Sequence, residues 1–219
     1  MGAFSPLPIA VAVVLLAAGG AFGWTIRSSA PTAHAAAGVT RAALALETLS
    51  SEKVCGAGGD DLLREVALRA DGPVAEDVVD YLPKKSPIPG YERAGTRPLD
   101  PTGDTEYLSG AVEGQVSSFR PSGEGWFDVY AYRYLTRPAA LESVAATIAG
   151  RACGGGAKVF AARGRPGMLV LDEGAGGGWL SAWWLTRADV VVVRYAGWGD
   201  PDADLANLAV ILGAAAAPD

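Results

Sequence analysis

Histidine and cysteine are the first residues to consider, because this chain has so few of them. The one histidine is His34, and the two cysteines are Cys55 and Cys153. Residues 39–219 contain no histidine, which excludes Ser-His-Asp and Cys-His catalysis and ordinary histidine-ligated metals from that part of the chain. Two cysteines alone do not form a structural zinc site either.

Carboxylate pairs are the acid–base groups that remain. Asp172 and Glu173 are adjacent in the sequence, and Glu124 and Asp128 are four positions apart. Two carboxyl groups that flank a glycosidic bond can hydrolyse it, one as general acid and the other as base or nucleophile. The same residues also fit solvated strand ends. We therefore assign no catalytic residue, expect no enzymatic activity, and keep a carboxylate-dependent hydrolase of envelope glycan as an alternative.

Three aspartates at alternate positions, Asp200, Asp202 and Asp204, resemble the start of a calcium-binding loop. Such a loop also needs a glycine for its sharp turn and a bidentate glutamate at its end, where this chain has Leu205 and Ile211. We expect a helix N-terminus here instead, with Asp200 as its cap. No metal or cofactor site is predicted.

Tryptophan is concentrated in one predicted strand, WLSAWWLT at residues 179–186. Alternation along a strand places Trp179 and Trp183 on one face of the sheet and Trp184 on the other. Rings on both faces indicate that helices or a partner cover the second side as well. They fit either core packing or an apolar or sugar-stacking groove. Trp179, Trp183 and Trp184 are our candidate ligand or partner surface.

The two cysteines favour a single disulfide formed in an oxidising compartment. Cys55 and Cys153 each follow a predicted helix and precede a glycine, a placement that would join two helix ends. In the loop-entropy model, closing a loop of roughly one hundred residues stabilises a domain by about 4–5 kcal/mol. Two independent buried thiols are the alternative.

The N-terminal sequence predicts contact with a membrane. Residues 6–26 carry no charged side chain, and as a helix they would match the thickness of a bilayer's hydrocarbon core. The run is longer than a usual signal-peptide core and no Lys or Arg precedes it, which favours an uncleaved anchor in the lipid bilayer. A signal peptide cleaved after the Ala33-His34-Ala35 step is the alternative.

The remaining sequence divides into a tether and one domain. We expect an anchor or signal sequence at residues 1–27, a flexible tether at 28–38, and a single domain at 39–219. The expected location is the cell membrane, crossed once, with the domain on its extracytoplasmic face. Cleavage near Ala35 would instead release a secreted protein.

The charge of the chain excludes nucleic acid as a partner. All 24 Asp and Glu residues follow residue 46, and the whole chain carries a formal charge of −6. Such a surface repels phosphate backbones unless basic residues cluster into a stripe. The nearest basic groups, Lys84-Lys85 and Arg163 with Arg165, are isolated pairs.

Helices are predicted near both ends of the domain. Apolar spacing and glycine stops indicate helices over residues 39–54, from Asp60 to about Gly72, and briefly over 74–82. Later helices begin at Pro138 and at Asp200-Pro201. Residues 83–101 carry five prolines and are predicted to be mostly loop.

The second half of the domain is predicted to be a sheet. Runs rich in β-branched and aromatic residues, separated by turn residues, indicate strands. These runs are residues 107–119, 127–135, 158–162, 168–172, 179–186 and 190–198. Hairpin-length connections predict a largely antiparallel sheet of about five to six strands, with helices packed on one face. The fold class is therefore α+β, preceded by one transmembrane or signal helix.

Several segments resemble a known family. They are VYAYRYLTRPAA at residues 129–140, Cys-Gly-Gly at 153–155, DVVVV at 189–193 and the Asp-Pro helix start at 200–201. This pattern resembles extracytoplasmic sensor-type domains of actinobacterial envelope proteins, including the external domain of PknH-like kinases and related lipoproteins. The resemblance implies an antiparallel sheet flanked by helices, disulfides and a ligand cleft. This chain departs from it in having one cysteine pair where the kinase domains carry two, and no lipobox cysteine.

Three function hypotheses follow. The leading one is a membrane-anchored extracytoplasmic binding or sensor-like module without catalysis of its own, which acts through an envelope ligand or a membrane protein partner. The glycan hydrolase is the second hypothesis, and two facing carboxyl groups across a cleft would favour it. The third is an accessory subunit of a membrane complex, which predicts an exposed apolar patch.

Overall fold

A computed structural model describes most of the chain after its N-terminal segment. The described residues are 45–70, 74–163, 165–173, 179–197 and 201–215. The expected membrane segment at 6–26 and the tether at 28–38 lie outside them. Within the described ranges, no helix combines the length and the apolar character that crossing a bilayer requires.

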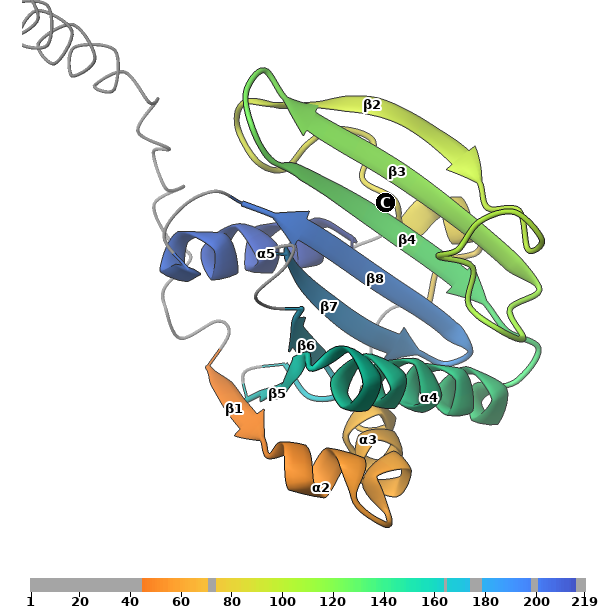
Figure 1. Ribbon diagram of the computed structural model, residues 1–219. Helices are drawn as coiled ribbons and strands as arrows, with labels where there is room; N and C mark the ends of the chain where they lie inside the picture. The colour runs from red at the N-terminus through yellow and green to blue at the C-terminus, as the bar shows by residue number, and fades with distance from the viewer. Residues whose placement is uncertain (1–44, 71–73, 164, 174–178, 198–200, 216–219) are drawn as a thin grey trace, which may run out of the picture. The chain divides into compact units, whose positions relative to one another are not determined.

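The described residues form an α+β fold around one antiparallel sheet (Figure 1), as predicted. The sheet has eight strands in the order β1-β5-β6-β7-β8-β4-β3-β2, and every neighbouring pair is antiparallel. The strands are β1 (Leu46–Leu49), β2 (Tyr91–Pro98), β3 (Glu113–Pro121), β4 (Trp126–Arg133), β5 (Lys158–Ala162), β6 (Leu169–Asp172), β7 (Trp179–Thr186) and β8 (Asp189–Ala196).

The expected count of five to six strands is wrong because both edge strands were missed. β1 lies inside the segment predicted as a helix over 39–54, where pairing with β5 overrides the helix propensity of a short Leu- and Glu-containing run. β2 lies inside the predicted loop over 83–101. Its residues are mostly exposed, so they lack the apolar alternation that identifies a half-buried strand.

The helices are α2 (Ser51–Cys55), α3 (Gly59–Leu68), the short 3-10 helix η2 (Val78–Tyr81), α4 (Arg137–Gly155) and α5 (Pro201–Ala215). α4 begins as the sequence predicts: Thr136 caps it by accepting from the backbone N–H of Ala139, and Pro138 stands in its first turn. It ends at Gly155, and the following Gly156 is its left-handed cap. α5 begins at Pro201, and the expected cap Asp200 lies outside the described residues.

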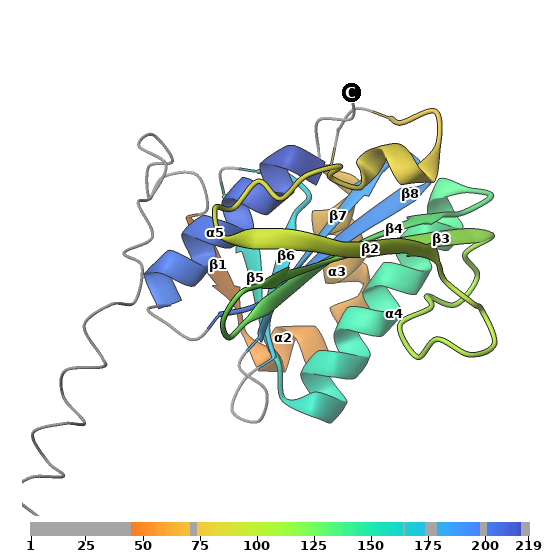
Figure 2. The same ribbon diagram turned by 90° about the horizontal axis from the view of Figure 1, so that it is seen from above.

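The expectation that helices cover one face of the sheet is wrong, since both faces are covered (Figure 2). Val192 of β8 belongs to the cluster beneath α3 and α4, whereas its neighbours Val191 and Val193 belong to the cluster with η2 and α5. Four consecutive buried valines at 190–193 are typical of a strand enclosed on both sides.

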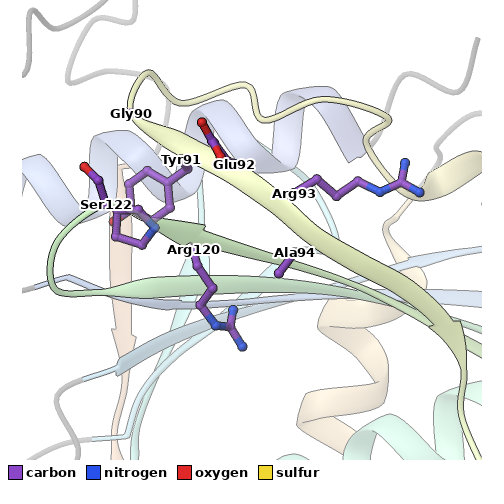
Figure 3. A pocket seen from close by; sticks show the side chains of 8 residues that line it. Gly90, Tyr91, Glu92, Arg93, Ala94, Arg120 and Ser122 are labelled. Atoms are coloured by element: carbon purple, nitrogen blue, oxygen red, sulfur yellow. The ribbon is translucent and has the colours of Figure 1, made fainter.

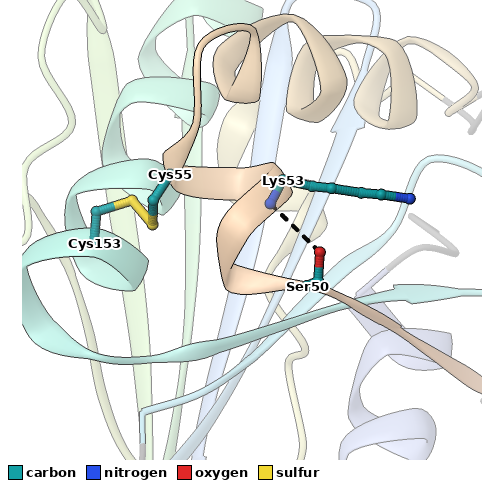
Figure 4. Close-up of a disulfide and its surroundings, with 4 residues drawn as sticks. All are labelled: Ser50, Lys53, Cys55 and Cys153. Carbon is teal, nitrogen blue, oxygen red and sulfur yellow. Dashed lines mark hydrogen bonds between the residues drawn. A yellow bond between two sulfur atoms is a disulfide. The ribbon is translucent and has the colours of Figure 1, made fainter.

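A disulfide joins Cys55 at the end of α2 to Cys153 in α4 (Figure 4), with a Cα–Cα distance of 5.6 Å. This confirms the predicted pairing, which closes a loop across a sequence separation of 98 residues. α2 itself is a single short helix, capped where the Ser50 hydroxyl accepts from the backbone N–H of Lys53 at 3.4 Å. The disulfide therefore fixes α2, near the start of the described residues, against α4.

A buried ion pair fixes η2 to the sheet. Arg133 and Asp189 are opposite each other in β4 and β8, and the guanidinium donates to both carboxylate oxygens, at 2.9 and 3.0 Å. The Tyr81 hydroxyl donates to the same carboxylate at 3.0 Å and accepts from the backbone N–H of Ala75. Burial, reinforced by the charge of Asp189, raises the pKa of Tyr81 to about 12.

Candidate ligand site on the open part of the sheet

The three tryptophans chosen from the sequence do not form one surface. Trp179 and Trp183 share the α4 side of the sheet and Trp184 faces the other side, as the alternation predicts. Trp183 is only 2% exposed and belongs to the core under α4. Trp179 and Trp184 are half-buried. A ligand surface on the α4 side therefore has Trp179 as its one accessible member of this set.

Trp183 is held by a polar network that explains its burial. Its indole N–H donates to the Ser181 hydroxyl at 3.0 Å, and that hydroxyl donates to the Glu173 carboxylate at 2.8 Å. Arg151 of α4 pairs with the same carboxylate, and its guanidinium lies 5.3 Å from the centre of a Trp183 ring. The indole N–H of Trp183 therefore has its hydrogen-bond partner inside the protein, and the residue has a structural role.

Trp179 finds its aromatic partner on another strand. Trp126 of β4 and Trp179 of β7 are both paired with Ala196 of β8, one from each side. The small Ala196 side chain lets the two indoles lean together until their ring centres are 6.0 Å apart, tilted by 57°. Both tryptophans are half-buried, so the pair forms an angled aromatic ledge that remains partly accessible. We call this pair the Trp126–Trp179 ledge.

Arg120 of β3 covers one side of the ledge. Its guanidinium carbon lies 5.7 Å from the centre of a Trp126 ring. The Nη1 group donates to Asp128 at 2.8 Å and to the backbone carbonyl of Phe119 at 2.8 Å. The Asp128 carboxylate is nearly buried and also accepts from the Tyr130 hydroxyl at 3.3 Å. Arg120 is thus fixed at one end while its side chain stays 46% exposed.

A second guanidinium lies on the same face. Arg194 of β8 is the cross-strand partner of Asp128, and its guanidinium carbon is 5.1 Å from the centre of the Tyr130 ring. Its Nη1 group reaches Glu106 at 3.5 Å, and its buried Nε has no acceptor within the described residues. Burial raises the pKa of Tyr130 to about 12. Its hydroxyl group therefore stays protonated at neutral pH and interacts only through hydrogen bonds.

On the α4 side, the described helices leave this part of the sheet open, whereas η2 packs on the opposite face of β3 and β4. α4 packs on β5, β7 and β8, whereas Figure 1 shows no helix in front of β2, β3 and β4. Residues 99–112 cover the far end of β4, where the Tyr132 hydroxyl donates to the Glu106 carbonyl and Tyr107 packs edge-on against the Tyr132 ring. The ledge and Arg120 lie beyond this cover.

A pocket of about 630 Å³ adjoins Arg120 where β2 begins and β3 ends (Figure 3). Its charged lining consists of Glu92, Arg93 and Arg120. Glu92 is opposite Arg120 in the sheet, yet Figure 3 shows its side chain directed away from the guanidinium. Arg93 points away along β2 and donates to the Lys84 carbonyl at 3.4 Å. Arg120 is therefore shared between the pocket and the ledge.

Two of the four candidate carboxylates, Asp128 and Glu173, are bound to other protein groups. Asp128 pairs with Arg120, and Glu173 pairs with Arg151 and accepts from Ser181. In the part of the chain that the structure describes, no group of three or more His, Cys, Asp or Glu residues is placed to hold a metal ion. What the site can do chemically is to stack on a flat or ring-shaped ligand and donate hydrogen bonds to it.

Of the residues at this site, the sequence singled out Trp179 as an aromatic candidate and Asp128 as one member of a carboxylate pair, and it did not point to Arg120, Arg194 or Trp126. A charged residue within an otherwise apolar strand predicts a buried ion pair, because a buried charge needs a partner. Asp128 is such a residue, since it lies between Phe127 and residues 129–132 of β4. The identity of those partners depends on strand order, which the sequence does not show.

No protein-family model matches the chain, and no curated protein matches it. Among solved structures, the extracellular domain of PknH from Mycobacterium tuberculosis is similar to it with 10% sequence identity and a TM-score of 0.40. The match covers 77% of this chain and 97% of that one. The likeness to this domain is weak and lies in the structure alone, without a match to a protein family in sequence.

Proposed function

We propose that this chain is a membrane-tethered extracytoplasmic binding module that has no catalytic activity and holds a ring-containing envelope ligand, such as a saccharide, on the Trp126–Trp179 ledge. The observation that carries the proposal is the ledge itself. Two tryptophans converge over Ala196 on a stretch of sheet that none of the described helices covers on this face, beside an exposed arginine. Aromatic faces bordered by a few fixed polar groups are typical of small-ligand sites.

Export is supported by the disulfide and by the sequence of residues 6–26. Cys55 and Cys153 are paired, as is usual for proteins of oxidising compartments. An uncharged run of bilayer length would deliver the domain there and keep it at the membrane surface. A tethered domain meets envelope components at high effective concentration, so even modest affinity would be enough for binding.

The test is to identify what remains bound to the native protein. The full-length chain is purified from its own membranes in mild detergent and analysed by native mass spectrometry. A saccharide-containing ligand is expected on the wild type and on the W184F control, and it is expected to be absent from the W126A/W179A double variant. A ligand retained equally by all three proteins contradicts binding at the ledge. Cleavage of envelope glycan by the purified protein contradicts the non-catalytic part of the proposal.

A second candidate function, an accessory subunit of a membrane complex, is favoured by a different observation. Exposed aliphatic side chains gather where β4 passes into α4: Leu135 is 83% exposed and Val112 is 53% exposed. Arg137, two residues after Leu135, donates to the backbone carbonyl of Leu68, and the Leu68 side chain is itself half exposed. Such a patch is typical of protein contacts. Co-purification of a membrane protein that is lost in an L135D variant would support this function.

A further inference from the structure

We infer that Arg120 binds an oxyanion of the ligand, so that the site selects acidic saccharides over neutral ones. This inference rests on the proposed function and concerns the same site. It depends on three properties of Arg120: its guanidinium is held in place by protein acceptors, one edge of it remains available, and it lies between a stacking surface and a pocket.

The position of the guanidinium is set by one of its nitrogen atoms. The Nη1 group of Arg120 donates to the Asp128 carboxylate and to two backbone carbonyls, those of Phe119 at 2.8 Å and Phe127 at 3.5 Å. The plane is further oriented by the Trp126 ring, 5.7 Å away. A guanidinium fixed in advance loses less conformational entropy on binding than a free one.

The opposite edge of Arg120 carries the remaining donors. Within the described residues, no acceptor is bound to its Nε or Nη2 group, and the side chain is 46% exposed. These two N–H groups form the fork that matches a carboxylate or phosphate with two parallel hydrogen bonds. The anchored and the available edges therefore have different roles: the first positions the group and the second faces a ligand.

Arg120 is the charged group of this pocket that also contacts the ledge. In the adjoining pocket of about 630 Å³, the other charged side chains, Glu92 and Arg93, are both directed away from Arg120. A sugar ring stacked on the ledge would place a substituent of that ring toward Arg120. The matching substituent is a planar oxyanion, and a ring carboxylate is the simplest group that provides one.

The test compares two probes that differ in the carboxylate alone. The full-length protein in detergent micelles is titrated by calorimetry with a tetrasaccharide of alternating glucuronate and N-acetylglucosamine, and with its carboxyl-reduced form. The acidic probe is expected to bind at least about tenfold more tightly, and its affinity is expected to fall with added salt. Competition by acetate but not by inorganic phosphate at equal ionic strength indicates a carboxylate site, and the reverse indicates a phosphate site.

Variants separate binding by Arg120 from its structural contacts. R120Q is expected to bind both probes equally and to lose the salt dependence, whereas R120K keeps the charge but loses the fork and retains only part of the preference. R93Q is the matched control, an exposed arginine of the same pocket that lies away from Trp126, and it is expected to keep the preference. If R120Q does not fold, as judged by circular dichroism, R120K decides.

The two proposals fail in different ways. Equal affinity of the wild type for both probes, or a preference that survives in R120Q, overturns the inference and leaves the ledge as a site for neutral saccharides. Failure of the wild type to bind either probe overturns saccharide binding at the ledge, and the inference with it.

Discussion

Gly167, in the turn between β5 and β6, lies directly against Ala70, which follows α3. A Cβ atom at Gly167 would be 2.1 Å from the backbone nitrogen of Ala70, and the backbone of Gly167 has φ of +82°. Both the close contact and the left-handed conformation require glycine. The β5–β6 hairpin, which adjoins the edge strand β1, thus packs on the end of a helix through one residue without a side chain.

Replacing Gly167 by alanine is expected to destabilise the domain by more than about 3 kcal/mol, because the backbone of residue 70 would have to move. The matched control is G90A, since Gly90 has φ of +83° but no atom near its would-be Cβ. The control is expected to lose only about 1 kcal/mol through backbone strain. Thermal unfolding followed by circular dichroism measures both, and equal losses would contradict the contact.

Removing the disulfide is expected to lower the free energy of unfolding by about 4–5 kcal/mol, since Cys55 and Cys153 close a loop across 98 residues. Urea unfolding of the wild type with and without reductant measures the effect. The C55S/C153S variant should match the reduced wild type and should not respond to reductant. An unfolding midpoint that reductant leaves unchanged in the wild type would show that the bridge is absent or contributes nothing.

Neutralising Asp189 is expected to destabilise the domain by more than about 2 kcal/mol, because D189N removes the buried carboxylate charge that the partly exposed Arg133 guanidinium and the Tyr81 hydroxyl both bind. D61N is a suitable control, since the Asp61–Arg64 pair is exposed on α3 and such pairs contribute less than about 1 kcal/mol. Urea unfolding at neutral pH compares the two variants. Similar losses of stability in D189N and D61N would mean that the Arg133–Asp189 pair contributes no more than an exposed ion pair.

Alkaline pH is expected to weaken the fold partly through Tyr81. Its pKa is raised to about 12 by burial, against about 10 in an unfolded chain, so the unfolded state loses this proton first. The stability that this residue contributes is therefore complete below about pH 10 and declines as pH rises toward about 12. Y81F is expected to be less stable at neutral pH by about 1–3 kcal/mol, because the Ala75 N–H loses its acceptor.

The contribution of Tyr81 to alkaline unfolding is measured by comparing Y81F with the wild type between pH 9 and 12. The difference in stability between them should shrink as pH rises through this range. Y91F is the control, since the Tyr91 ring packs against Phe127 at the edge of the same cluster. A difference that grows with pH would contradict the direction of the pKa shift.

The central elements of the fold could be predicted from the sequence because their residues carry local signals. The strands at 158–162 and 179–186 were predicted with the bounds that the structure has, and α4 was recognised by the proline in its first turn. The edge strands could not be predicted, since β2 is mostly exposed and β1 is only four residues long. Their extended conformation depends on pairing with β3 and β5, which is a non-local interaction.

The site was predictable only in part, for a related reason. A concentration of tryptophan drew attention to β7, and alternation assigned each ring to the correct face. Whether a ring is accessible depends on where α4 ends and which strands adjoin β7. Trp183 lies under α4, and Trp126 approaches Trp179 only because β8 separates β4 from β7 and carries alanine at the crossing point.

The most direct test of ligand binding at the ledge is to observe its indole N–H groups. In a nitrogen-15 correlation spectrum of the full-length protein in micelles, assigned by single Trp-to-Phe variants, the acidic tetrasaccharide is added stepwise. Binding at the ledge predicts saturable shifts of the Trp126 and Trp179 indole signals, with those of Trp183 and Trp184 unchanged. Shifts confined to Trp184, or no shift at Trp126 and Trp179 at saturating probe, would contradict it.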